Sequence, residues 1–262
     1  MNFVLILLLS ACTLINLDFR AESKNSINKV RQSPKLEDEV FSMQDVLQNG
    51  DCYSRRREFD TDFIEAALEY FPEIAAGSEF DRFANKKLKR WPLGTNISIS
   101  LNERTDKKDL QVFQDLIPVV EKLTGLEFFI VNNDELADMN FYKINYSEMP
   151  RVMDNYVPNN WGLFNYFSND NYEIKGAKLA VASDKTNKFE LRHLIIEEFI
   201  QSLGLVNDSY RYMDSIFQEE WTEVQRPAPI DWLLLEFLYR PEVSPGMEVK
   251  EVVEILRKIY ID

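Results

Sequence analysis

The segment from Phe189 to Asp208 reads FELRHLIIEEFIQSLGLVND and constrains the fold more than any other part of the chain. At about 100° per residue, one arc of the expected helix is apolar and must face a core. The opposite arc is polar, with side chains stacked on successive turns. We therefore expect a helix with one buried face and one face that lines a cleft. The apolar arc holds Ile195, Ile196, Phe199, Ile200 and Leu203, and the polar arc holds His193, Glu197, Glu198 and Gln201.

Gly204 is expected to end this helix, because glycine adopts the left-handed backbone conformation at helix ends without a steric penalty. The chain then turns sharply enough to bring Asn207 or Asp208 back over the polar face. A polar cluster in a cleft is the expected result. Its candidate binding residues are His193, Glu197, Gln201, Asn207 and Asp208, and its candidate catalytic residue is Glu198.

The polar face offers one imidazole, two carboxylates and a carboxamide, with Asp208 nearby. Such an oxygen-rich set suits calcium, magnesium or manganese better than zinc. His193 and Glu197 are the weak candidate ligands. A solvated helix face with an ordinary hydrogen-bond network is the favoured alternative, since glutamine is a poor ligand. We therefore expect no cofactor, with a divalent metal such as calcium or manganese as the competing hypothesis.

The composition excludes two classes of function. The net charge is −14 and the isoelectric point is about 4.7. So acidic a chain repels a phosphate backbone, which argues against nucleic acid as a partner. The chain also contains a single histidine, so a zinc site built on two or three imidazoles is impossible.

The N-terminal residues resemble a bacterial targeting signal. Val4–Leu9 is an apolar run too short to span a bilayer, and the letters LSAC (residues 9–12) end it. This tetrapeptide resembles the lipobox of bacterial lipoproteins, in which the signal is cleaved before the cysteine and the cysteine is acylated. The resemblance implies a signal peptide at residues 1–11, lipidation of Cys12, for example with palmitate, and a flexible tether over residues 12–50. A cleaved secretory signal followed by an ordinary cysteine is the alternative.

The lipobox resemblance also implies a location. Thr13, and not aspartate, follows the cysteine, which favours the outer membrane of a Gram-negative cell. We expect a protein of the bacterial cell envelope that is anchored in this membrane by lipid and faces the periplasm. With Cys12 acylated, Cys52 is the only other cysteine, so no intrachain disulfide forms.

Hydrophobic periodicity predicts an α+β domain over residues 88–262, preceded by a helical extension over residues 51–87. The extension holds a helix at Asp60–Phe71, with Asp60 or Thr61 as its cap. In the domain, Gly125 is expected to close the first helix. The expected strands are Asn96–Leu101, Leu126–Val131, Asp138–Tyr142 and Ala177–Ala182, and the expected helices are Thr105–Leu123, the segment that Phe189 opens, and Ile230–Tyr239.

A long polar and aromatic loop is expected at Asn159–Tyr172, which reads NNWGLFNYFSNDNY. This mixture of aromatic rings and asparagines is common where peptides or sugars are stacked and hydrogen-bonded. The position of the loop, just before a predicted strand, favours the rim of the cleft. Trp161 and Tyr166 are its candidate binding residues. The alternative is a loop that covers a secondary apolar cluster.

The helix segment resembles the HExxHxxGxxH motif of metzincin-type zinc peptidases, with all three zinc histidines absent. Glu197, Gln201 and Asn207 stand in their places, whereas Glu198 and Gly204 keep the places of the general-base glutamate and the glycine. The letters DSIF (residues 214–217) resemble the methionine turn of these enzymes, with phenylalanine in place of methionine. The resemblance implies a zincin-like fold: a mixed twisted sheet, two long helices and a C-terminal helical part.

The chain also resembles an uncharacterised family of bacterial putative lipoproteins. The motifs that carry this resemblance are EExxQxLGLxND, DSIF, and an LY-Pro ending that continues to Pro-Gly-Met at residues 245–247. The resemblance covers roughly residues 88–262, with the strongest motifs between residues 193 and 247. The family is a domain of unknown function, so this resemblance predicts membership and not an activity.

Two functions remain open. In the first, the domain is a degenerate, non-catalytic metallopeptidase-like scaffold that binds a protein or another envelope component, with the membrane contacted through the lipid. In the second, it is an atypical hydrolase or peptidase with Glu198 as general base and a non-zinc metal or no metal. Zinc lowers the pKa of its bound water from about 15.7 to about 7. Because the chain lacks the histidines that would bind this zinc, an active zinc peptidase is not expected.

Overall fold

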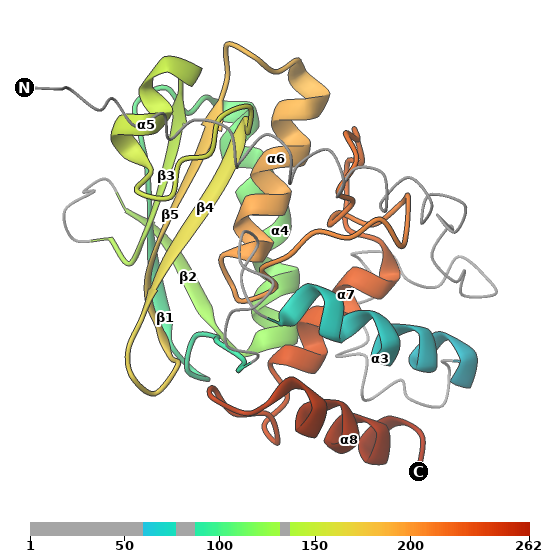
Figure 1. Cartoon of the computed structure of the whole chain (residues 1–262). Helices are drawn as coiled ribbons and strands as arrows, with labels where there is room; N and C mark the ends of the chain where they lie inside the picture. The colour runs from blue at the N-terminus through green and yellow to red at the C-terminus, as the bar shows by residue number, and fades with distance from the viewer. Residues whose placement is uncertain (1–59, 77–86, 132–136) are drawn as a thin grey trace, which may run out of the picture.

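The computed structural model describes residues 60–76, 87–131 and 137–262 (Figure 1). The predicted signal peptide and tether, Cys12 and Cys52 lie outside these residues. Within them the chain forms an α+β fold with one five-stranded sheet and six α-helices. None of these helices is long and apolar enough to cross a membrane.

The sheet is mostly parallel, with strand order β2-β1-β3-β5-β4. Only β4 runs antiparallel, paired with β5 along one edge, and β2 forms the other edge. The three inner strands carry most of the buried apolar residues of the sheet, as expected for strands covered on both faces. The strands are β1 (Asn96–Leu101), β2 (Glu127–Val131), β3 (Met139–Ile144), β4 (Gly162–Ser168) and β5 (Ile174–Ala182).

Two long helices, α4 (Lys107–Thr124) and α6 (Lys188–Gln201), pack side by side on one face of the sheet (Figure 1). Both begin at a side-chain cap, Asp106 for α4 and Asn187 for α6, whose oxygen accepts backbone N–H groups of the first turn. Gly125 ends α4 in the left-handed conformation, as predicted. A second, smaller apolar cluster, separate from the main core, lies between the short helix α5 (Met149–Val152) and the sheet.

Three further helices, α3 (Thr61–Ala75), α7 (Pro229–Leu238) and α8 (Val249–Tyr260), form a second layer (Figure 1). Helix α3 packs against both α7 and α8, and α7 also contacts α4. Residues of α3 such as Phe63 and Phe71 belong to the same hydrophobic core as α6. The division between an extension and a main domain at residue 87 stays a prediction.

The predicted strands and helices are present, with shifts of a few residues at their ends. The expected loop at Asn159–Tyr172 is wrong in its middle, because Gly162–Ser168 forms β4. Strand β4 is held in place by its antiparallel pairing with β5, and the residue pattern of one strand alone does not reveal such pairing. Helix α8 was not predicted, although Val252, Leu256 and Tyr260 recur at helical spacing.

Candidate functional site

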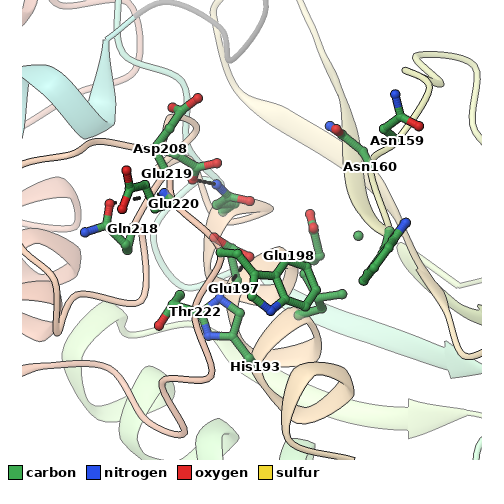
Figure 2. Close-up of a pocket in the computed structure, with 15 residues that line it drawn as sticks. Asn159, Asn160, His193, Glu197, Glu198, Asp208, Gln218, Glu219, Glu220 and Thr222 are labelled. Carbon is green, nitrogen blue, oxygen red and sulfur yellow. Dashed lines mark hydrogen bonds and ion pairs between the residues drawn. The ribbon is translucent and has the colours of Figure 1, made fainter. Parts of the chain in front are cut away.

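A pocket of about 240 Å³ lies along the polar face of α6 (Figure 2). Three parts of the chain build it: α6 itself, the residues that lead into β4, and the irregular segment between α6 and α7. Asp208 closes one side. The lining residues are Asn159, Asn160, Trp161, Gly162, His193, Leu194, Glu197, Glu198, Gln201, Asp208, Gln218, Glu219, Glu220, Trp221 and Thr222.

The polar side chains of α6 that line this pocket are almost fully buried. His193 is 4 % exposed, Glu197 7 %, Glu198 5 % and Gln201 2 %. Figure 2 shows Glu197, Glu198 and His193 gathered on the same face of the helix. The opposite side of α6, including Phe199, lies in the main core. Buried polar groups are costly unless each finds a partner, so their partners define the site.

His193 is held at both ring nitrogens. Its Nδ1 lies 2.8 Å from the carbonyl oxygen of Val224, and its Nε2 lies 3.4 Å from a carboxylate oxygen of Glu197. A carbonyl only accepts, so Nδ1 carries a proton, and Nε2 is directed at the Glu197 carboxylate. Burial lowers the pKa of His193, but the hydrogen bond and the charge of Glu197 outweigh this effect, so the pKa lies above its ordinary value.

Asp208, and not Asn207, returns over the helix face. The side-chain amide of Gln201 donates to Asp208 Oδ1 at 2.7 Å. Asn207 points elsewhere, and its side-chain amide donates to the backbone oxygens of Glu73 and Ala76. The sequence did not decide which of Asn207 and Asp208 returns over the polar face. In the structure Asp208 lines the pocket, whereas Asn207 ties the turn after α6 to the end of α3.

Glu198 lies against the backbone of β4. An ideal Cβ built on Gly162 would stand 2.2 Å from Glu198 Oε1 and 2.9 Å from a methyl carbon of Leu194. Only glycine therefore permits this close approach of strand and carboxylate. Glu198 occupies a fixed place in the pocket wall.

Two tryptophans face each other beside the pocket. The rings of Trp161 and Trp221 meet edge to face at a centroid distance of 4.8 Å, and Trp221 is 57 % exposed. Tyr166, the other aromatic candidate, lies on β4 but does not line the pocket. Its ring instead receives the ammonium group of Lys89 at 5.2 Å from the centroid.

The segment Gln218–Thr222 is the part of the lining that sequence reasoning largely missed. None of its five residues is among the candidate site residues predicted from the sequence. The segment lacks a regular helix or strand, so no periodicity marks it. Its letters QEEWT, which combine acidic and aromatic residues, were the available signal.

A buried hydrogen-bond network holds the DSIF turn, which directly precedes the pocket segment Gln218–Thr222. Asp231, at the start of α7, accepts from Ser215 Oγ at 2.7 Å and from the backbone N–H groups of Ile216 and Ala228 at 2.8 and 2.7 Å. Tyr70 of α3 shares a hydrogen bond with Ser215 Oγ at 3.1 Å. Burial raises the pKa of Asp231 to about 7, although its three donors lower it. The network joins α3, the DSIF turn and α7.

The candidate metal ligands His193 and Glu197 lie together, but only as a pair. Among the residues that the structure describes, no three histidine, cysteine, aspartate or glutamate side chains are grouped so as to hold a metal ion. Because His193 Nδ1 faces Val224, only Nε2 remains on the side of Glu197.

Comparison with known proteins gives a family without a function. A search of curated proteins found no match. The model of a family described as "Protein of unknown function (DUF2927)" matches residues 65–258, which include α4, α6, α7 and the whole sheet. This match spans well over half of the 262 residues. The chain therefore belongs to the DUF2927 family of proteins of unknown function.

Proposed function

We propose that this protein is a lipid-anchored lipoprotein of the bacterial envelope whose domain binds a ligand in the α6 pocket without catalysis. The observation that carries the proposal is the set of four adjacent polar side chains on α6. They are at most 7 % exposed, yet they line a cavity of about 240 Å³ and are not packed into the core. A concave site with convergent polar groups is the usual form of a ligand pocket.

The proposed scaffold is metzincin-like. The order of elements from β1 to α6, the positive-φ Gly204 in the turn after α6 and the buried DSIF turn support this relation, although α6 itself ends at Gln201 with Ser202 as its cap and not at the glycine. Ile216 and Phe217 of the turn are both fully buried, and Ser215 connects the turn to α7 through Asp231. The scaffold then supplies a cleft between an active-site-type helix and an edge strand.

The chemistry of the pocket favours binding over hydrolysis. Glu198 faces the cavity and could accept a proton, as the alternative hydrolase function requires. A carboxylate alone, however, is a weak base toward water with a pKa of about 15.7. The single histidine is already engaged with Val224 and Glu197. Within the described part of the chain, these contacts do not place His193 as the base of a serine, threonine or cysteine nucleophile.

Purified protein is expected to contain no stoichiometric metal and to show no shift in melting temperature with calcium, manganese or zinc. Elemental analysis and thermal denaturation measure these two properties. Peptide substrates are expected to remain uncut by the wild type and by Glu198→Gln alike. Peptide cleavage by the wild type that Glu198→Gln abolishes would establish the hydrolase alternative and end the binding proposal.

Cys12 is expected to carry the lipid. Cells that express the wild type in the presence of radioactive palmitate should yield a labelled protein in the membrane fraction, because acyl chains give firm anchoring at about 0.8 kcal/mol per buried methylene. Cys12→Ala should lose both the label and the membrane association. Cys52→Ala is the matched control and should retain both. Label that persists in Cys12→Ala would contradict the lipid anchor.

A further inference from the structure

The pocket lining is strongly acidic. It contains five carboxylates, from Glu197, Glu198, Asp208, Glu219 and Glu220, and neither lysine nor arginine. His193, the one histidine of the lining, lies with its Nε2 3.4 Å from a carboxylate oxygen of Glu197. A cleft lined by side chains of one charge sign raises the local concentration of ligands of the opposite sign. The lining therefore favours a ligand that brings positive charge.

The carboxylates are arranged at two depths. Glu197 and Glu198 lie at the base, at 7 % and 5 % exposed, on the rigid helix α6. Glu219 and Glu220 are exposed and lie on the segment at the mouth. Figure 2 shows the two pairs on different elements around the same space. Outer charges of this kind attract a cation, and the buried pair receives it.

The tryptophans are a second and independent feature. Trp221 exposes more than half of its surface although its ring is large and apolar, and it packs edge to face on Trp161 at the pocket. The faces of tryptophan rings attract ammonium and guanidinium groups, and the rings also cover alkyl chains. A metal ion uses only the carboxylates, whereas an organic cation on an alkyl stem uses both features.

We propose that the pocket binds an organic cation, namely an ammonium or guanidinium group at the end of an alkyl chain such as a lysine or arginine side chain. The charged group meets Glu198 and Glu197 at the base, and the alkyl chain lies against Trp221 and Trp161. Asn160, across the pocket from Glu198 (Figure 2), offers an amide to the backbone of the ligand. This inference rests on the proposed binding function and names its ligand class.

Four blocked amino acids test the proposal: the N-acetyl methylamides of lysine, arginine, norleucine and glutamate. Norleucine matches the alkyl chain of lysine without the charge, and glutamate reverses the charge. The protein is labelled with 5-fluorotryptophan and observed by fluorine NMR. Trp161 and Trp221 line the pocket, whereas Trp91 and Trp232 are buried at 2 % and 3 % exposed and serve as internal references.

Lysine and arginine probes should shift the Trp161 and Trp221 signals to saturation, and the norleucine and glutamate probes should bind at least about tenfold more weakly. Glu198→Gln should weaken the cationic probes at least about tenfold, because it removes one charge of a buried pair. Trp221→Ala, a change at an exposed position, should weaken them about fivefold. Glu254→Gln makes the same charge change on the exposed side of α8, away from the lining, and should leave the affinity unchanged.

Equal binding of norleucine and lysine at the pocket signals would overturn the cation class and leave the binding function in place. Absence of any response to all four probes would overturn it as well. Loss of binding in Glu254→Gln as large as in Glu198→Gln would show that only the overall charge matters. Cleavage of peptide substrates, by contrast, would overturn the proposed function itself. Trp221→Ala keeps the test decisive if Glu198→Gln fails to fold.

Discussion

Replacement of Gly204 by alanine is expected to destabilise the fold by at least about 3 kcal/mol. Gly204 has a φ of +119°, a backbone conformation that is costly for any residue with a side chain. An added Cβ would also stand 2.2 Å from the backbone oxygen of Lys89 and 3.1 Å from a methyl carbon of Leu238. The backbone oxygen of Lys89 cannot yield as the end of a flexible side chain can, so the turn after α6 must shift.

The measurement is thermal or urea denaturation of the two proteins. For a domain of this size, 1 kcal/mol lowers the melting temperature by about 2–4 °C, so a loss of about 6–12 °C is expected. Gly125→Ala is the matched control, because Gly125 has a φ of +68° and no atom within 4 Å of an added Cβ. It should cost only about 1 kcal/mol. Equal losses in the two variants would contradict the role assigned to the Lys89 contact.

Asp231 is expected to make the protein lose stability between pH 5 and pH 8. Its pKa is about 7 in the folded protein, where burial raises it, and about 3.9 in the unfolded chain. The folded protein therefore holds a proton that the unfolded chain has already released. The contribution of this proton to stability is full below about pH 4 and is lost as the pH rises through 7. The expected loss from pH 5 to pH 8 is about 2–3 kcal/mol.

Asp231→Asn is the control for this pH dependence. Asparagine keeps an oxygen for the N–H groups of Ile216 and Ala228 and presents an amide toward Ser215 Oγ, as the protonated carboxyl does. Urea denaturation at pH 5 and pH 8 should show the loss in the wild type and not in the variant. The charge of Asp231 also raises the pKa of His193, so the difference between the two proteins reports Asp231 together with this coupling. Equal slopes with pH would contradict the assignment.

The sequence predicted the elements that have a strong period. Helix α4, with its cap at the start and Gly125 at the end, follows from local chemistry that needs no tertiary contact. Strand β4 did not follow, because its side chains do not alternate between apolar and polar and its position depends on pairing with β5. A residue such as Gly162, needed for the approach to Glu198, carries no local mark of that contact.

Only part of the candidate site could be predicted, because helical spacing is a local property and most contacts of the site are not local. Helical spacing alone places His193, Glu197 and Gln201 on one face of α6. The partner of His193 on that face, Val224, comes from a later segment of the chain. The contact between Trp161 and Trp221 likewise joins two segments that are distant in sequence. Such contacts depend on how the layers close on one another. Asn207 and Asp208 are adjacent in sequence, and only the actual turn separates their roles.

The wall of the pocket combines one element that tolerates few substitutions with two segments that tolerate more. Helix α6 is buried on nearly all sides from His193 to Leu203, so most substitutions there disturb the core. Asn159, Glu219, Glu220 and Trp221 are exposed, and substitutions at such positions usually alter stability by no more than about 0.5 kcal/mol. The ligand selectivity proposed for this pocket can therefore be changed through these surface residues while the helix stays intact. Changes in ligand selectivity would then arise at the residues of the pocket mouth, whereas the buried helix at its base would keep the fold unchanged.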